Sequence, residues 1–129
     1  MEIIYKTCKA KSNFAYCSDI YKDKETLISF NHMCESVADD EFRGKDVKFD
    51  NDIEGTLYLC YPLTVVVKDS IKFNSLYTLI SEIRRVYQEV YKDRKSMISC
   101  GIWGHDIYDL CIEGIEVFTD GSVDVSIGS

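Results

Sequence analysis

Apolar residues recur at steps of three and four between residues 73 and 91, in the stretch FNSLYTLISEIRRVYQEVY. This spacing places them along one side of a helix, while polar residues take the other side. Asn74 or Ser75 can cap the start, and basic residues near the end suit the negative end of the helix dipole. The pattern predicts one long amphipathic helix over about 74–94.

Weaker helical spacing also occurs before residue 40. A short apolar set at residues 14, 17 and 20 is followed by Leu27, Phe30, Cys34 and Val37. Since these positions share one side of a helix, they predict one or two N-terminal helices, the second over about 24–38. The apolar stretch at residues 2–8 precedes them and is typical of a strand.

The middle of the chain has a different pattern. Short apolar runs at residues 47–49, 56–61 and 63–67 are separated by DNDIEG (residues 50–55) and by Pro62. Such runs between breakers predict strands joined by turns, with Pro62 at an edge, a bulge or a break. DNDIEG matches the first positions of a calcium loop, but its twelfth position is Tyr61 instead of the glutamate required, so a polar turn is the simpler interpretation.

The chain ends in a second clear pattern. TDG (residues 119–121) lies between apolar runs at residues 115–118 and 123–127, and the second run alternates with polar residues. This arrangement predicts an antiparallel hairpin. Together these elements predict one α+β domain over residues 1–129, with a mostly antiparallel sheet and the long helix packed on it.

Six cysteines are scattered along the chain without any CxxC pair. Free cysteine often behaves as a small buried hydrophobe, so we expect reduced thiols in a cytoplasmic protein. No apolar run reaches the length that crosses a membrane, and the cysteines and two histidines lack zinc-site spacing. We therefore expect a soluble protein with neither metal nor cofactor.

Charge is distributed unevenly along the chain. The formal net charge is −7, and residues 97–129 hold six acidic residues without any Lys or Arg. An acidic surface repels phosphate backbones, which disfavours direct nucleic-acid binding. It attracts a basic protein, because opposite fields speed the encounter.

The stretch GIWGHDIYDL, residues 101–110, is the densest in candidate chemistry. His105 could act as a general base oriented by Asp106 or Asp109. Alternatively, Gly101 and Gly104 permit a tight bend and the stretch is a structural corner, which is the interpretation we favour. The exposed aromatic residues of such a corner could also anchor an interface.

These features predict a non-catalytic binding protein that inhibits a basic, nucleic-acid-handling partner such as a nuclease. Toxin-immunity proteins and phage-encoded anti-defence inhibitors of the anti-CRISPR type share this composition. A second acidic stretch, from Asp39 to Glu54, is the fallback contact surface. The expected contact residues are acidic positions and two aromatic anchors near the C-terminus: Trp103, Asp106, Tyr108, Asp109, Glu113, Glu116, Asp120 and Asp124.

Two alternatives stay open, as does the oligomeric state. The first is a small hydrolase that uses His105 with Asp106 or Cys100. The second is a protein that sequesters a nucleotide signal, with its phosphate held by a basic set. A solvated helix face is the simpler explanation of that set, which comprises Arg84, Arg85, Lys92, Arg94 and Lys95.

Overall fold

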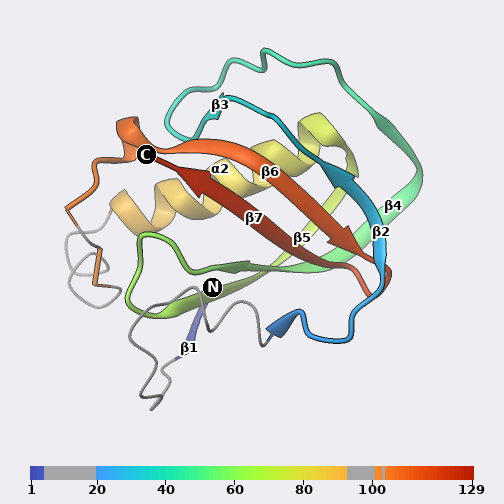
Figure 1. The fold of residues 1–129 in the computed structure, drawn as a ribbon, viewed down its shortest axis with the longest axis horizontal. Helices are drawn as coiled ribbons and strands as arrows, with labels where there is room; N and C mark the ends of the chain where they lie inside the picture. The colour runs from blue at the N-terminus through green and yellow to red at the C-terminus, as the bar shows by residue number, and fades with distance from the viewer. Residues whose placement is uncertain (5–19, 93–100, 103) are drawn as a thin grey trace.

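The computed structural model describes residues 1–4, 20–92, 101–102 and 104–129. Within this part of the chain, a single antiparallel-rich sheet and one long helix account for most of the regular structure (Figure 1). The elements in chain order are β1 (Glu2–Ile4), β2 (Thr26–Phe30), β3 (Glu35–Ser36), β4 (Lys48–Leu59), β5 (Val66–Ser75), α2 (Leu76–Lys92), the short 3-10 helix η1 (Ile107–Asp109), β6 (Cys111–Phe118) and β7 (Ser122–Gly128).

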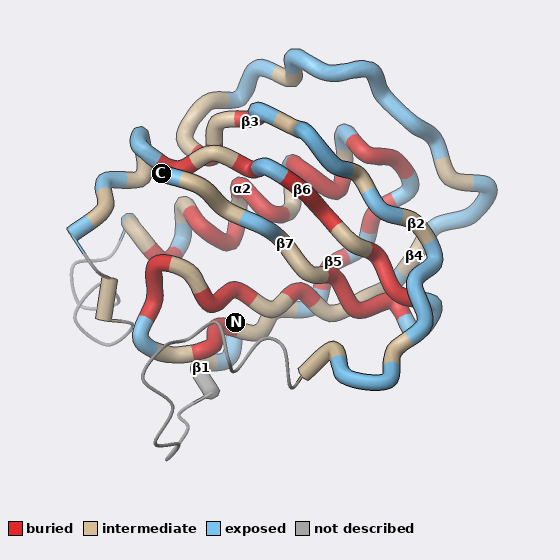
Figure 2. The backbone as a smooth tube through the Cα atoms, viewed as in Figure 1, coloured by how far each residue is buried: buried red, intermediate tan, exposed pale blue. Residues whose placement is uncertain are grey.

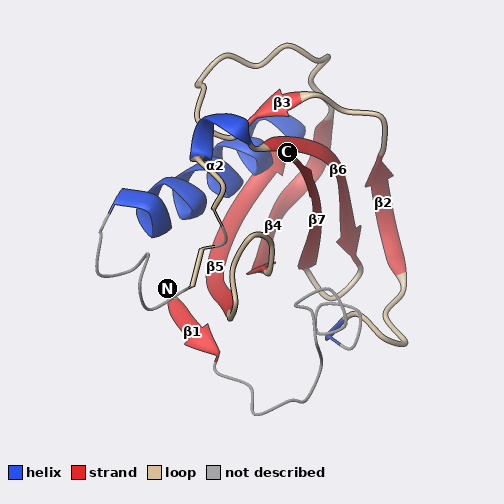
Figure 3. Ribbon diagram, turned by 60° about the vertical axis from the view of Figure 1, so that its left-hand side comes forward, coloured by secondary structure: helices blue, strands red, loops and turns tan. Residues whose placement is uncertain are grey.

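The strands lie in the order β1-β5-β4-β7-β6-β2, and β3 pairs with the start of β6. Neighbouring strands run antiparallel except β4 and β7, which pair in parallel through Thr56–Tyr58 and Ser122–Asp124. Helix α2 packs on one face of the sheet, chiefly against β5 (Figure 3). The predicted α+β fold with a mostly antiparallel sheet is therefore confirmed.

Alternation along the strands separates the core from a polar outer face, which is the face directed away from α2. Leu57 and Val123 are fully buried beneath the helix, together with the apolar side of α2 (Figure 2). Their neighbours Tyr58 and Asp124 point to the opposite face, because successive side chains of a strand alternate. The outer face therefore carries the polar residues of β4, β6 and β7.

Helix α2 confirms the predicted long helix; it begins at Leu76, and the predicted end near residue 94 lies outside the described residues. Ser75 caps it, since the Thr78 N–H donates to Ser75 Oγ at 3.1 Å. Asp46 adds a second cap from a distant loop, because its Oδ1 accepts from the Tyr77 N–H at 2.9 Å. This carboxylate supplies the negative charge that the first turn of α2 lacks.

The predicted helix over 24–38 is wrong. Residues 26–30 form β2, which pairs with β6 through a bulge between Thr26 and Ile28, and residues 35–36 form β3. Pairing with a distant strand overrides the local helical spacing, as weak propensities allow. His32, which helical spacing would place within that helix, is exposed with a φ of 57°. Residues 5–19, where the first predicted helix falls, lie outside the described residues.

The predicted turn at DNDIEG is also wrong, because residues 50–55 form part of the continuous strand β4. This strand pairs with β5 along most of its length, with an irregularity between Lys48 and Ile53. The calcium-loop interpretation fails with the turn, since a strand does not wrap around an ion. The break at Pro62 is confirmed: Tyr61–Pro62 is a cis peptide between β4 and β5.

The C-terminal hairpin is confirmed as β6 and β7, with Gly121 at a φ of 87° in its turn. The expectation of reduced cysteines is wrong for Cys60, which is disulfide-bonded. Cys34 and Cys111 are free thiols. In the described part of the chain, no helix has the length and apolar character needed to cross a membrane.

Candidate protein-binding surfaces

Two acidic residues of the expected contact set lie directly opposite each other on the outer face. Glu116 of β6 pairs in register with Asp124 of β7. Burial raises the pKa of Asp124, and the neighbouring Glu116 carboxylate raises it further, although the Val125 N–H opposes this by donating to it. The Thr26 hydroxyl donates to Glu116 from β2. The pair therefore concentrates negative charge at the middle of the outer face.

Asp120, in the β6–β7 turn, is already neutralised within the chain. Its carboxylate lies 2.7 Å from Lys24 Nζ and also accepts from the N–H and hydroxyl of Ser122. The Lys24 hydrogen bond, followed by those from Ser122, lowers the pKa of Asp120. This residue contributes less to an acidic binding surface than its sequence position suggests.

The corner before β6 presents Tyr108 and Asp109 to solvent. Asp106 precedes η1 and caps it, because its Oδ1 accepts from the Tyr108 N–H at 3.0 Å. The cap holds Tyr108 in the open, where 79% of it is exposed. Glu113 follows as an exposed residue of β6, while Trp103 lies outside the described residues. Asp106, Tyr108, Asp109 and Glu113 are thus exposed, but η1 lies against α2, whereas the Glu116–Asp124 pair lies on the face directed away from it.

His105 is held by two tyrosines. Its Nε2 lies 3.0 Å from the Tyr61 hydroxyl, and its carbonyl oxygen accepts from the Tyr91 hydroxyl at 3.0 Å. Among the described side chains, no carboxylate hydrogen-bonds the imidazole, because Asp106 bonds the backbone of η1 instead. Cys100 lies outside the described residues. This geometry favours the structural corner over the hydrolase interpretation.

Two arginines of the basic set that could hold a phosphate contact carboxylates instead. Arg84 is buried and ion-paired with Glu35 at 3.3 Å, which corrects the expectation of a solvated helix face at that position. Arg85 lies 2.9 Å from Glu82 and 3.1 Å from Asp69. Arg94 and Lys95 lie outside the described residues, and Lys92 is exposed at the end of α2. Both arginines therefore have partners that compete with a phosphate.

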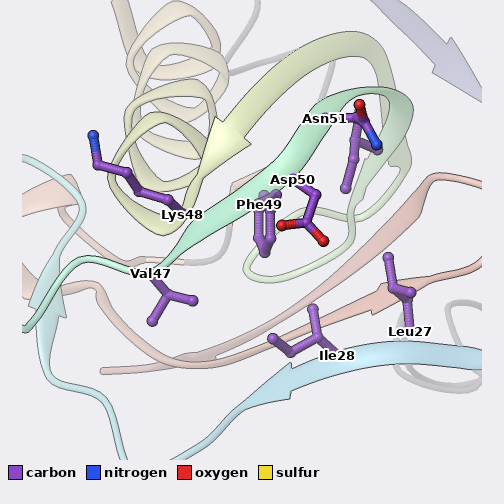
Figure 4. A pocket seen from close by; sticks show the side chains of 8 residues that line it. Leu27, Ile28, Val47, Lys48, Phe49, Asp50 and Asn51 are labelled. Atoms are coloured by element: carbon purple, nitrogen blue, oxygen red, sulfur yellow. The ribbon is translucent and has the colours of Figure 1, made fainter.

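The fallback acidic stretch surrounds an apolar groove that the sequence pattern did not indicate. The groove has a volume of about 390 Å³ and lies between β2 and the first half of β4 (Figure 4). The ring of Phe49, which lines the groove, lies with its centroid 6.4 Å from that of Phe30. Its lining residues are Leu27, Ile28, Val47, Lys48, Phe49, Asp50, Asn51 and Ile53.

Among the acidic residues of β4 and the loop before it, of which Asp50 lines the groove, some have partners and others do not. Asp46 caps α2, and Asp52 lies 3.6 Å from Lys72. Asp50 and Glu54 are exposed, and neither has an ion-pair partner among the described residues. Asp50 and Glu54 are therefore two acidic residues of β4 that no lysine or arginine of the described residues neutralises.

Sequence reasoning missed Leu27 and Val47 as surface residues. Leu27 is 54% exposed and Val47 is 37% exposed, and both line the groove. Helical spacing had assigned Leu27 to a buried helix face. No local signal could have corrected this, since the groove is lined by β2 and the first half of β4, which are not neighbours in the sheet order and lie far apart in the sequence.

Comparison of this chain with known protein families, with curated proteins and with solved structures gave no match. The candidate surfaces therefore rest on the geometry and the charge of the chain itself.

Proposed function

We propose that this protein is a non-catalytic binding protein that captures and inhibits a basic, nucleic-acid-handling protein. The observation that carries the proposal is the Glu116–Asp124 pair, which lies on a hairpin without Lys or Arg, and Glu113 of the same hairpin and Asp109 of η1 are also exposed. Such a surface complements a positive nucleic-acid cleft and steers it into contact. Exposed Tyr108 supplies an aromatic anchor at its end.

The proposed contact surface differs from a uniform acidic patch in two respects. Asp120 is bound to Lys24 and Ser122, so it contributes little free charge. Asp124 is half-buried, so less of its carboxylate is available for direct contact. The residues available for direct contact are Asp106, Tyr108, Asp109, Glu113 and Glu116.

The proposed compartment is the cytoplasm, where a toxin-immunity protein or a phage anti-defence inhibitor would meet its target. The disulfide of Cys60 is more typical of an oxidising compartment. Mass spectrometry of protein alkylated during lysis of native cells distinguishes these locations, because a cytoplasmic protein would carry Cys60 as a free thiol.

The test begins with capture of partners by the tagged protein from lysate of its native host, washed at low and at high salt. A single basic protein released by salt is the expected result. Association of that protein is then measured with Asp109→Lys in η1 and with Glu89→Lys in α2, which change the net charge equally. We expect Asp109→Lys to slow association by roughly threefold or more at low salt, and Glu89→Lys to leave it nearly unchanged.

Two outcomes would contradict the proposal. Equal association rates for the two variants would exclude the C-terminal surface as the contact site for the partner. Capture of no protein, with a nucleotide or another small molecule copurifying instead, would favour sequestration of a ligand.

A further inference from the structure

A cavity of about 610 Å³ lies between two segments that flank β3 in the sequence. One segment is residues 29–35, which run from the end of β2 into β3, and the other is residues 42–45 with Val47, which lead to β4. The buried Leu76, at the start of α2, completes the lining. Pockets that hold small ligands have volumes of roughly 300–1,000 Å³, so this cavity is large enough for a small organic molecule.

Both segments supply apolar side chains to the cavity. Phe30 and Met33 come from the first segment, and Phe42 comes from the second, and all three are half-buried. The Phe42 ring is held edge-on against Tyr77, with centroids 5.7 Å apart. Aromatic and aliphatic side chains of this kind favour a ligand with an apolar body.

The available charges of the lining are positive. Lys45 is exposed and has no ion-pair partner among the described residues. Arg43 lies 3.9 Å from Asp39, and an exposed pair of this kind holds the guanidinium only loosely. His32 faces the same cavity from the first segment, and its exposed imidazole can donate a further hydrogen bond.

The acidic groups at the cavity are already satisfied within the chain. Glu35 is the only carboxylate among the described residues that line it, and it is paired with the buried Arg84. Glu35 also accepts from the N–H groups of residues 43–44. Asp46, in the second segment, accepts from the Tyr77 N–H at the start of α2. The cavity therefore offers free positive charge, although the formal net charge of the chain is −7.

We infer that this cavity binds a small organic anion, with a carboxylate or phosphate head at Lys45 and Arg43 and an apolar body against Phe30 and Phe42. The inference goes beyond the proposed function and does not depend on it, since this ligand has the opposite charge to the proposed protein partner. A guanidinium can hold two oxygens of either head in parallel, and an ammonium adds a point charge.

The probes share a naphthalene ring and differ in the head: naphthoate, naphthyl phosphate, the neutral naphthalenemethanol and the cationic naphthylmethylamine. Acetate and inorganic phosphate present each head without the apolar body. Isothermal titration calorimetry on the full chain at low salt measures their binding. We expect saturable binding of at least one naphthyl anion, roughly tenfold or more tighter than the alcohol, because hydrogen bonds to charged groups contribute about 1.5–3 kcal/mol. Binding of only one of the two anions would identify the head as carboxylate or phosphate.

Two glutamine variants test the site on the protein. Lys45→Gln removes a charge from the cavity, and Lys22→Gln removes the same charge from an exposed position near the β6–β7 turn, where Lys24 binds Asp120. We expect Lys45→Gln to weaken the bound anion by roughly tenfold and Lys22→Gln to leave its affinity unchanged. Both positions are exposed, so neither substitution should impair folding.

Nuclear magnetic resonance locates the bound anion. The largest amide shifts are expected at residues 31–35 and 43–45, which line the cavity. Three outcomes would overturn the inference: no binding of either naphthyl anion, equal binding of the anions and the alcohol, or equal affinities of the Lys45→Gln and Lys22→Gln variants for the anion. None of them bears on the proposed function, which is tested by association of a protein partner with Asp109→Lys.

Discussion

Glu35 and Arg84 form a buried ion pair, with Oε2 and Nη2 3.3 Å apart and each side chain only 4% exposed. Both groups are satisfied by further contacts. Glu35 accepts from the N–H groups of Arg43 and Gly44, and Arg84 donates to the carbonyl oxygens of Ser36 and Glu41. The pair fastens residues 35–44 to α2. It therefore shapes one wall of the cavity that is lined by residues 29–35 and 42–45.

Removal of one partner of this ion pair should therefore lower the free energy of unfolding. We expect Arg84→Met to lower the free energy of unfolding by about 3–5 kcal/mol, because it leaves the Glu35 carboxylate buried without its counter-ion. Arg85→Met is the matched control on the same helix, and the exposed pairs that it breaks contribute about 0–1 kcal/mol. Urea denaturation measures both values. A cost for Arg84→Met no larger than that of Arg85→Met would contradict this role.

The Glu116–Asp124 pair should make stability depend on pH. The pKa of Asp124 is raised in the folded state, so protonation stabilises the fold below the usual value of 3.8, and this contribution is lost as the pH rises through the folded pKa. Asp124→Asn should therefore increase the free energy of unfolding at pH 7 by about 0.2–1 kcal/mol. The gain should vanish near pH 3, where the wild-type carboxyl is protonated in both states.

The lowered pKa of Asp120 predicts that stability changes with pH in the opposite direction. The Lys24 contact favours its ionised form, so the stabilisation is present above 3.8 and is lost as the pH falls through the folded pKa. Asp120→Asn should destabilise the protein at pH 7 and have less effect in acid. A destabilising effect that does not change between pH 7 and pH 2 would show that the Lys24 contact contributes through packing alone.

Gly55 controls the junction between β4 and the C-terminal hairpin. A Cβ at this position would overlap the carbonyl oxygen of Gly121, which accepts from the Thr56 N–H. We expect Gly55→Ala to cost about 1–3 kcal/mol of unfolding free energy, because the clash is with backbone that cannot rotate away. Gly44→Ala should change stability by less than about 0.5 kcal/mol, since its Cβ meets only ordinary contacts. Equal effects of the two substitutions would contradict the close approach.

Cys34 and Cys111 should form a disulfide under mild oxidation, since their sulfur atoms lie 3.5 Å apart. The Cys34 thiolate attacks oxidised glutathione and releases one glutathione thiolate, and the Cys111 thiolate then displaces the second. Burial, followed by the contact with Cys34, raises the pKa of Cys111 to about 11. The closing step should therefore accelerate about tenfold per pH unit between pH 7 and 9.

Peptide mapping by mass spectrometry measures this reaction, with a linked Cys34–Cys111 peptide as the expected product. The Cys111→Ser variant should stop at the mixed disulfide of Cys34. Wild-type protein that also stops there would show that the two backbones cannot approach to the S–S bond length of about 2 Å.

Local sequence determined those elements whose interacting residues lie close together along the chain. Helix α2 follows from the spacing of its apolar residues and from the Ser75 cap, and both signals act within a few residues. The β6–β7 hairpin likewise follows from alternation on either side of TDG, with Gly121 at a positive φ. The acidic character of the C-terminal third was also readable, because charge depends on composition alone.

Tertiary structure decided the features whose partners are distant. Leu27 and Phe30 fit a helix by spacing, but pairing with β6 about ninety residues later makes them part of a strand. Asp120 belongs to an acidic stretch, but Lys24 reaches it from the opposite end of the chain and neutralises it. The groove between β2 and β4 has no local signal, because its lining comes from two strands that are far apart in the sequence and are not neighbours in the sheet. Local propensities are worth tenths of a kcal/mol per residue, whereas strand pairing and burial contribute more and depend on contacts that spacing does not encode.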